Sequence, residues 1–123
     1  MQSTEKSDQR DDALLKQVRL ALAAIKNVEE KRMFSGVTFM VNGKMCISVG
    51  KGRLMCRIDP EKHDEAVKKP GTRTVFMKGK EYKGFLYVDG DAVKSKREFD
   101  YWVNLCLEFN EKAKASPKKK KQK

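Results

Sequence analysis

The sequence has very little of the residues on which metal sites and catalytic centres usually depend. It contains one histidine, His63, and three cysteines, Cys46, Cys56 and Cys106, which lie far apart along the chain. An odd number of cysteines without a Cys-X-X-Cys pair argues against a disulfide framework and against a zinc site. Free buried thiols are typical of proteins in a reducing compartment. We therefore expect a cytoplasmic protein that binds neither a metal ion nor a cofactor.

Long apolar segments are also missing. The longest purely apolar run is Leu20–Ile25, which is far too short to cross the hydrocarbon core of a bilayer. The first residues, Met1–Asp12, are polar and lack the apolar centre of a signal peptide. We expect a soluble, intracellular chain that makes no contact with a membrane, and a disordered segment over residues 1–12.

Charge is abundant but unevenly distributed. Charged residues make up 37% of the 123 residues, and the net charge is +11. Seven of the 28 basic residues lie from Lys112 to Lys123, a segment without an acidic residue. The remaining 21 basic and 17 acidic residues leave residues 1–111 with a net charge of only +4. We predict one mildly basic domain over residues 13–111 and a disordered, lysine-rich tail over residues 112–123.

Three short antiparallel strands are predicted in the middle of the first half of the chain. Side-chain character alternates over Gly36–Val41, Lys44–Val49 and Arg53–Ile58 with the period of a half-buried strand. Asn42-Gly43 joins the first two strands and is a strong hairpin signal, because both residues tolerate positive φ. Gly50-Lys51-Gly52 is predicted to turn the next pair.

The alternation also predicts which face of this sheet is buried. The face expected to point into the core carries Val37, Phe39, Val41, Met45, Ile47, Val49, Leu54, Cys56 and Ile58. The opposite face carries Thr38, Met40, Cys46 and Met55, and it is the candidate surface for a protein partner.

Two amphipathic helices are predicted near the ends of the domain. The first runs from about Asp12 to Lys26 and repeats apolar residues at helical spacing. The last begins with a capping box from Ser95 to Glu98. Its apolar stripe consists of Phe99, Trp102, Val103, Cys106 and Phe109.

A third, shorter helix and a second hairpin are predicted between them. Asp59-Pro60 is typical of a helix start, and Pro70-Gly71 of a helix stop. Strands are expected over Arg73–Met77 and Tyr82–Val88. The order α-β-β-β-α-β-β-α predicts an α+β domain with a mainly antiparallel five-stranded sheet, a three-strand meander plus a hairpin, and helices packed on one face.

Several segments resemble the TfoX N-terminal domain family. The resemblance begins at Glu30-Lys-Arg-Met33-Phe34-Ser-Gly36 and continues through Phe39-Met-Val-Asn42-Gly43-Lys44-Met-Cys46 and Leu54-Met-Cys-Arg57. It includes Pro70-Gly71, Met77-Lys-Gly79 and Lys83-Gly84-Phe-Leu-Tyr-Val88, and covers about Leu14 to Phe109. Ser35 departs from the family pattern, which often has glycine there, whereas Gly36 is retained.

The resemblance carries expectations about function. The family takes its name from TfoX, also called Sxy, a bacterial regulator of natural competence. Similarity to it implies the same α+β fold in a bacterial cytoplasm and a role in transcription regulation. TfoX has a separate C-terminal domain after this one, whereas this sequence continues into a lysine-rich tail, so we expect a stand-alone, single-domain member. It implies no catalytic residues, since the family has none established to carry over. The motif residues Met33, Phe34, Gly36, Asn42, Gly43, Lys44 and Gly84 are expected to be structural.

No residue cluster in the sequence predicts an enzyme. His63 lies in a polar helical segment and is expected at the surface, where it would not act as a base. Cys56 is expected in the core. Cys46 alternates with Lys44 and Ser48, so it is expected to be more exposed, which leaves a redox role open.

The basic residues are the remaining functional signal. Lys118, Lys119, Lys120 and Lys121 can neutralise phosphates without reading sequence, or can act simply as a solubilising tail. Lys78, Lys80 and Lys83 cluster with Tyr82 around the second hairpin turn, which is typical of either a weak nucleic-acid site or a solvated turn. Our first hypothesis is therefore a non-catalytic regulatory or adaptor domain that acts through contacts with an unknown protein. The alternative is a protein that associates with nucleic acid nonspecifically through its tail.

Overall fold

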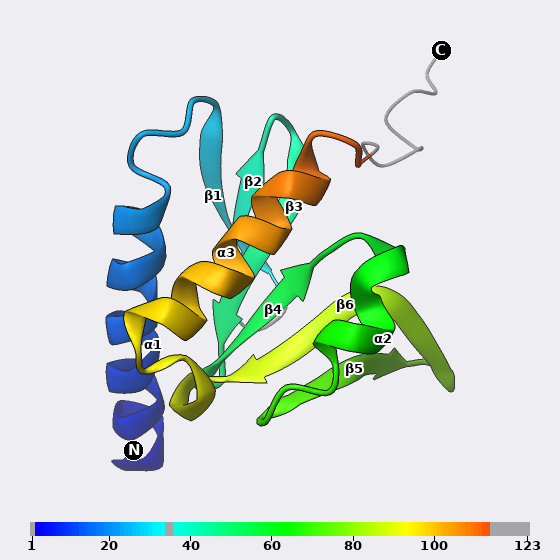
Figure 1. The fold of residues 1–123 in the computed structure, drawn as a ribbon. Coiled ribbons are helices and arrows are strands. Elements are labelled where there is room, and N and C mark those ends of the chain that lie inside the picture. Colours follow the sequence, from blue (N-terminus) through cyan, green and yellow to red (C-terminus); the bar gives the residue numbers. More distant parts are fainter. Residues whose placement is uncertain (1, 34–35, 114–123) are drawn as a thin grey trace.

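The computed structural model describes residues 2–33 and 36–113 (Figure 1). Along the chain the described elements are α1 (Gln2–Ala21), β1 (Val28–Met33), β2 (Gly36–Val41), β3 (Lys44–Gly50), β4 (Arg53–Arg57), a 3-10 turn η1 (Pro60–Lys62), α2 (His63–Ala66), β5 (Thr72–Met77), β6 (Lys80–Asp89), a 3-10 turn η2 (Gly90–Val93) and α3 (Lys96–Asn110). The predicted α+β class is confirmed, with three helices and an antiparallel sheet among these residues.

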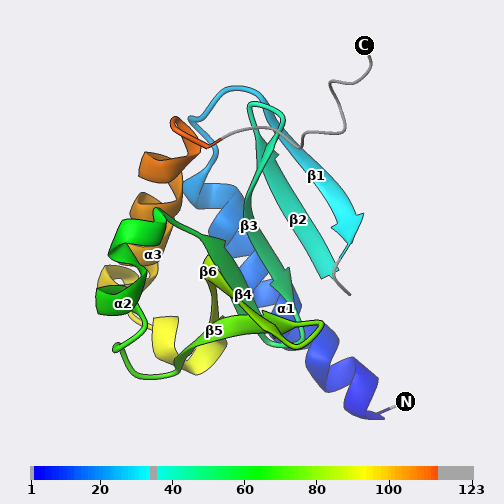
Figure 2. The same cartoon turned by 90° about the vertical axis from the view of Figure 1, so that its right-hand side faces the viewer.

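The strands form one sheet in the order β1-β2-β3-β4-β6-β5, and all neighbours within the described residues are antiparallel. Helices α1 and α3 contact β3 and β4 and also contact each other. They cover one face of the sheet, while α2 packs beside β6 at the other end (Figure 2). The second face of the sheet is not covered by a described helix, so the side chains on it are candidates for binding.

The sheet has six strands among the described residues, so the prediction of five was wrong. The missed strand, β1, has the sequence VEEKRM and pairs along its full length with β2. It lies at the edge of the sheet, and five of its six residues are exposed. Such a strand shows no alternation of apolar and polar residues, which is the signal on which the prediction depended.

Helix α1 differs from its prediction at both ends. It begins at Gln2 rather than near Asp12, so most of the segment expected to be disordered is helical. The carboxylate of Asp11 accepts a hydrogen bond from the backbone N–H of Gly52 at 2.8 Å, which connects this part of the helix to the β3–β4 turn. The helix ends at Ala21 rather than near Lys26, and Asn27 then adopts positive φ.

The predicted hairpin turns are confirmed by the backbone angles. Asn42-Gly43, Lys51-Gly52 and Lys78-Gly79 each have two consecutive residues with φ between 52° and 76°. This is the pattern of a type I′ turn, whose twist matches that of the strands it joins. The predicted helix caps are also present: Asp59 Oδ1 accepts from Glu61 N, and Ser95 Oγ accepts from Glu98 N.

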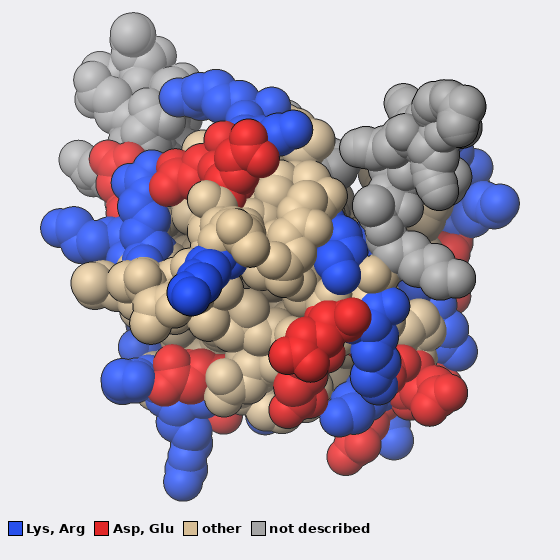
Figure 3. Space-filling model, turned by 90° about the horizontal axis from the view of Figure 1, so that it is seen from above, with Lys and Arg blue, Asp and Glu red and all other residues tan. Residues whose placement is uncertain are grey.

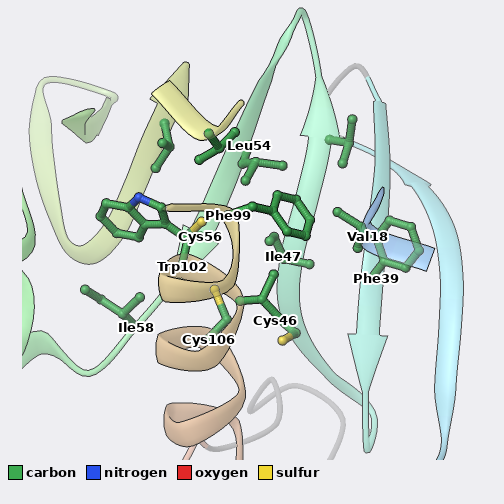
Figure 4. Packing of buried hydrophobic residues seen from close by; sticks show 14 of the residues in the cluster. Val18, Phe39, Cys46, Ile47, Leu54, Cys56, Ile58, Phe99, Trp102 and Cys106 are labelled. Carbon is green, nitrogen blue, oxygen red and sulfur yellow. The ribbon is translucent and has the colours of Figure 1, made fainter. Parts of the chain in front are cut away.

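The hydrophobic core lies between the sheet and the helices α1 and α3 (Figure 4). Val18 of α1, Phe39 of β2, Leu54 of β4 and Trp102 of α3 are each at most 1% exposed. The predicted tail begins inside this fold, because Ala113 is buried and Lys112 pairs with Asp59 at 3.2 Å. Residues 114–123, which include Lys118–Lys121, lie outside the described residues.

Candidate functional site

The strand register places a continuous row of side chains on the uncovered face of the sheet. The row runs from edge to edge through Lys31, Thr38, Ser48, Met55, Tyr87 and Arg73. Its centre is buried, with Thr38, Ser48 and Met55 each at most 5% exposed. The hydroxyl groups of Thr38 and Ser48 hydrogen-bond to each other, which satisfies two buried polar groups.

The prediction that Thr38, Met40, Cys46 and Met55 form an exposed surface for a protein partner was therefore wrong. Thr38, Cys46 and Met55 are buried and Met40 is half-buried. A small cavity of about 40 Å³ lies beside Ser48, Met55 and Tyr87. This volume accommodates a water molecule but not an organic ligand.

Cys46 also lies on the other face from the one predicted. The β2–β3 register shifts between Phe39, which pairs with Ile47, and Met40, which pairs with Met45. Cys46 is therefore the extra residue of a bulge in β3 and has no partner on β2. Because a bulge re-aims the side chains beside it, Cys46 turns toward the core with Ile47. The thiols of Cys46, Cys56 and Cys106 come from β3, β4 and α3 and gather beneath α3 (Figure 4).

All three cysteines are free and buried. Interaction with the Cys106 thiol, followed by burial, raises the pKa of Cys46. Burial raises the pKa of Cys106 well above its usual value. A thiol with a raised pKa carries little thiolate and is a poor nucleophile, so the structure provides no support for a redox role of Cys46.

His63 was predicted at the surface, and this was wrong: it is buried under the bend of β6. Its Nδ1 accepts a hydrogen bond from the backbone N–H of Gly84 at 2.8 Å. The ring proton therefore resides on Nε2, which donates to Thr74 Oγ1 at 2.8 Å. Both ring nitrogens are engaged, and burial lowers the pKa of His63. These contacts give the histidine a structural role.

The family motif residues hold the end of α3 against the β2–β3 hairpin. Lys44 Nζ donates to the carbonyl oxygens of Asn110 at 2.7 Å and Ala113 at 3.0 Å. Asn110 Nδ2 donates to the carbonyl oxygen of Val41 at 3.1 Å. Asn42 adopts φ 55° in the turn, and Gly43 adopts φ 76°. The Asn-Gly-Lys segment thus combines a tight turn with a cap for the last carbonyl groups of a helix.

Two glycines of the motif are required by close contacts or by backbone angle. A Cβ atom at Gly36 would collide with the carbonyl oxygen of Val49 on the neighbouring strand. Gly84 has φ +95°, which a side chain rarely tolerates, and it lies beneath Pro60. Met33 is exposed at the end of β1, whereas Phe34 lies outside the described residues.

An arginine–aromatic cluster, which the sequence did not predict, lies on β4, β6 and β5, on the uncovered face except at Arg57, which reaches α3. Its members are Arg53, Arg57, Arg73, Phe85 and Tyr87. Arg53 Cζ lies 3.7 Å from the ring centroid of Tyr87, and Arg73 Cζ lies 5.6 Å from it. Arg57 Cζ lies 5.6 Å from the Phe85 ring and 5.6 Å from the ring of Phe109 on α3. The alternation along β4 and along β6 indicated which arginine and aromatic side chains share a face of each strand. That the two sets lie side by side depends on the pairing of β4 with β6, which the sequence did not reveal.

The arginines of this cluster have few anionic neighbours. Within the described residues Arg53 and Arg57 form no ion pair, and Arg73 pairs with Asp89 at 3.4 Å. Arg57 Nε is buried without a hydrogen-bond acceptor. Burial also lowers the pKa of Arg57. The cluster therefore presents positive charge that nearby carboxylates offset only in part.

The structure separates the predicted lysine patch into two parts. Lys78 and Lys80 are exposed at the β5–β6 turn. Lys83 is directed to α2, where its Nζ lies 3.4 Å from Asp64 Oδ1. Tyr82 packs edge-on against Phe85, with ring centroids 6.4 Å apart. Lys78 and Lys80 remain candidates, while the charge of Lys83 is partly offset.

The two edges of the sheet differ in charge. β1 presents a run of exposed charged residues from Glu29 to Arg32. β5 is uncharged from Thr74 to Met77 and exposes Phe76 (62%) and Met77 (38%). Charged edge strands prevent unwanted pairing, and uncharged exposed ones are open to an added strand. The β5 edge is therefore the candidate site for a protein contact.

Charge is not concentrated at the end of the molecule that is uppermost in Figure 1. Outside the grey atoms, basic and acidic side chains are interspersed around an uncharged centre in that view (Figure 3). Among residues 2–33 and 36–113, no group of three histidine, cysteine or acidic side chains is arranged to hold a metal ion. No helix in that part of the chain is long and apolar enough to cross a membrane.

These features define a small α+β domain in which an antiparallel sheet is covered by helices on one face. The sequence matches the family model of the TfoX N-terminal domain over residues 20–110, and the chain belongs to that family. Comparison with curated proteins returned no match, and neither did comparison with solved structures.

Proposed function

We propose that this protein is a non-catalytic regulatory adaptor domain that acts on gene expression through protein contacts. Membership of the TfoX N-terminal domain family supports a regulatory role, and natural competence in a bacterial cytoplasm is the process that the family name suggests. The engagement of His63 in two hydrogen bonds and the burial of the three thiols support a role without chemistry.

The observation that carries the proposal is the uncharged outer edge of β5. An extended segment of a partner adds to such an edge as a further antiparallel strand, and its backbone hydrogen bonds provide the affinity. Phe76 and Met77 supply exposed apolar surface beside the new strand. The charged edge of β1 does not accept a strand in this way.

The charges at the two ends of β5 indicate the chemistry of the partner. Arg73 lies near one end, and Lys78 and Lys80 follow the other. A second copy pairing antiparallel about Val75 would place Arg73 of each chain opposite Met77 of the other, one position from Lys78. The positive charges that flank β5 would then gather at both ends of the pair, and like-charge repulsion weakens such pairing. The edge is better suited to a partner segment with acidic residues flanking an apolar centre.

The test is an affinity capture from native lysate with matched variants. Phe76→Lys places a charge on the edge, whereas Leu20→Lys places one on α1, where Leu20 is 72% exposed. Both sites are exposed, so both variants are expected to fold. We expect a protein retained by the parent and by Leu20→Lys to be lost with Phe76→Lys, with or without nuclease. Equal retention by all three forms would refute the proposal, and a dimer abolished by Phe76→Lys would assign the edge to a second copy.

A second candidate function is nonspecific association with nucleic acid through the lysine tail. The net charge of the chain is +11, and seven lysines lie in the segment 112–123. This concentration of positive charge favours binding to phosphates. Lys118–Lys121 would neutralise phosphates, with Lys78 and Lys80 as further basic residues of the fold. Its test is how steeply the affinity for duplex DNA falls as the salt concentration rises.

A further inference from the structure

We infer that the arginine–aromatic cluster is a binding site for single-stranded nucleic acid on the face of the sheet. It shares only Arg73 with the β5 edge, where an added strand would lie beside the sheet, and it includes no residue of the lysine tail. Its five side chains come from three neighbouring strands, so the sheet backbone fixes their spacing. Sites on strands hold side chains more rigidly than sites on loops. Arg53, Arg73 and Tyr87 lie on the sheet face that no described helix covers, whereas Arg57 lies at the end of β4, where Phe109 of α3 reaches its guanidinium group.

The stacking of guanidinium groups on rings creates flat platforms. Arg53 Cζ lies 3.7 Å from the Tyr87 ring centroid, which is a stacking distance, and Arg73 approaches the same ring at 5.6 Å. Stacking restricts the guanidinium to a few orientations, so less conformational freedom is lost when a ligand binds. Unpaired bases stack on both aromatic rings and guanidinium planes.

The charge of the cluster suits the phosphate backbone. Arg53 and Arg57 have no ion-pair partner among the described residues, and Arg57 holds its charge half-buried between Phe85 and Phe109. A phosphate on the exposed side of these groups would offset charge that the fold leaves uncompensated. Guanidinium groups bind phosphate oxygens through two parallel hydrogen bonds, which lysines cannot do.

Single strands fit this site better than duplexes or acidic proteins. In a duplex the faces of the bases are stacked on each other and cannot contact the rings. A carboxylate can pair with an arginine but makes no use of the flat platform. A splayed single strand uses both the planes and the charges.

The test measures the binding of the full chain to three labelled probes of equal length at low salt. The first is a single-stranded oligothymidine of about 20 nucleotides, longer than the roughly 4–16 nucleotides that a small fold covers. The second is an abasic strand with the same phosphates, and the third is a duplex. We expect the abasic strand and the duplex to bind at least about 10-fold more weakly per site than the oligothymidine, since each stacked base contributes a factor of roughly 5 to 100.

Full-length variants locate the site. Arg53→Gln and Tyr87→Leu are each expected to weaken oligothymidine binding by roughly 5-fold to 100-fold. Arg19→Gln, on the opposite face of the sheet, removes one positive charge and should leave binding nearly unchanged. Replacement of Lys118–Lys121 by glutamine should weaken all three probes by a similar factor. Thermal midpoints of each variant, compared with the parent, separate loss of binding from loss of fold.

Several outcomes would overturn the inference. Equal binding of the abasic and normal strands would show that the bases make no contact. Unchanged affinity of Arg53→Gln and Tyr87→Leu, with loss only in the tail variant, would assign binding to the tail. Displacement of the oligothymidine by polyglutamate of equal charge would make this a general anion site for acidic protein. Phe76→Lys should retain oligothymidine binding, so this test and that of the β5 edge can fail independently.

Discussion

Trp102 is the largest side chain among those fully buried in the described core, at 1% exposed. It packs from α3 onto the sheet, with Tyr101 edge-on beside it at 5.1 Å between ring centroids. Truncation of a buried tryptophan costs about 3–5 kcal/mol, and a domain of this size has about 5–15 kcal/mol in total. We expect Trp102→Ala to be close to unfolded in a urea titration. A midpoint near that of the parent would show that α3 packs differently.

His63 predicts a pH dependence of stability. In the folded state, burial lowers the pKa of His63 below its value of about 6.5 in the unfolded chain. As the pH falls below about 6.5, His63 of the unfolded chain therefore binds a proton before His63 of the folded chain does. The stability that is present above this pH is lost as the pH falls toward the lower pKa of the folded state. Free energies of unfolding measured between about pH 7.5 and 5.5 should decrease in the parent.

The control for this prediction is His63→Gln, whose amide can accept from Gly84 and donate to Thr74 but does not titrate. It should be less stable than the parent at neutral pH yet show a flatter profile. The pKa values of Glu30 and Asp59 are also lowered, by hydrogen bonds from Arg19 and from the Glu61 backbone respectively. Carboxylates titrate at lower pH than His63. An unchanged slope in His63→Gln would contradict the assignment.

The thiols lead to a prediction at the same scale. Because Cys46, Cys56 and Cys106 are free and buried, native protein should react slowly with a thiol reagent at neutral pH. Denatured protein should release three reactive thiols without added reductant. Mass spectrometry of freshly lysed material should detect no Cys46–Cys56 disulfide, and recovery of that bridge would restore the redox hypothesis.

The residues that sequence reasoning placed wrongly share one cause. Cys46 and His63 were assigned by the character of their sequence neighbours, but their positions are decided by contacts far along the chain. The β2–β3 bulge rotates Cys46 inward, and the partners of His63 are Thr74 and Gly84. Periodicity along one segment contains no information about such contacts.

At the scale of elements, Lys44 joins the β2–β3 hairpin to the end of α3. Its ammonium group donates to the carbonyl oxygen of Asn110, the last residue of α3, and to that of Ala113 just beyond the helix, where the helix dipole is negative. We expect Lys44→Met to reduce the free energy of unfolding by about 0.5–2 kcal/mol. Amide exchange should become faster mainly in the last turn of α3. Lys94→Met, at an exposed lysine, serves as control and should change stability little.

Elements were predictable where turn chemistry and alternation agreed. Asn42-Gly43 and Ser95 were sufficient to locate a hairpin and a helix start, because each residue has a local structural role. β1 was missed because VEEKRM pairs through its backbone while its side chains face water. The arginine–aromatic cluster was missed because the adjacency of β4 and β6, which are separated by α2 and β5, is a property of topology.

At the scale of the whole molecule, the uneven charge predicts how binding to duplex DNA depends on salt. If the tail neutralises about five phosphates, the slope of log affinity against log salt is roughly −0.9 × 5, or about −4.5. Affinity should then fall several-hundred-fold between roughly 50 and 200 mM salt. Binding should be indifferent to sequence, because flexible lysines present point charges to the backbone.

Cutting the chain after Ala115 tests whether the tail is responsible. This cut retains all described residues, so the thermal midpoint should be nearly unchanged while most duplex binding is lost. If the truncated chain binds duplex DNA as well as the parent does, the binding residues are in the folded domain, and Lys78, Lys80 and their neighbours become the candidates. Absence of binding by both forms at low salt would remove the tail hypothesis.

The contrast between the two sheet edges has a consequence for assembly. A contact that joins β5 of one molecule to β1 of the next would repeat by the same rotation and translation, and such heterologous contacts produce open-ended fibres. Here that contact would bring the charged run of β1 beside Phe76 and Met77 and remove its charges from water at a large cost. If a partner strand adds at β5 as proposed, the charged edge of β1 would prevent the contact from repeating to the next molecule. We expect neutralisation of the whole run from Glu29 to Arg32 to remove that barrier and to permit open-ended assembly.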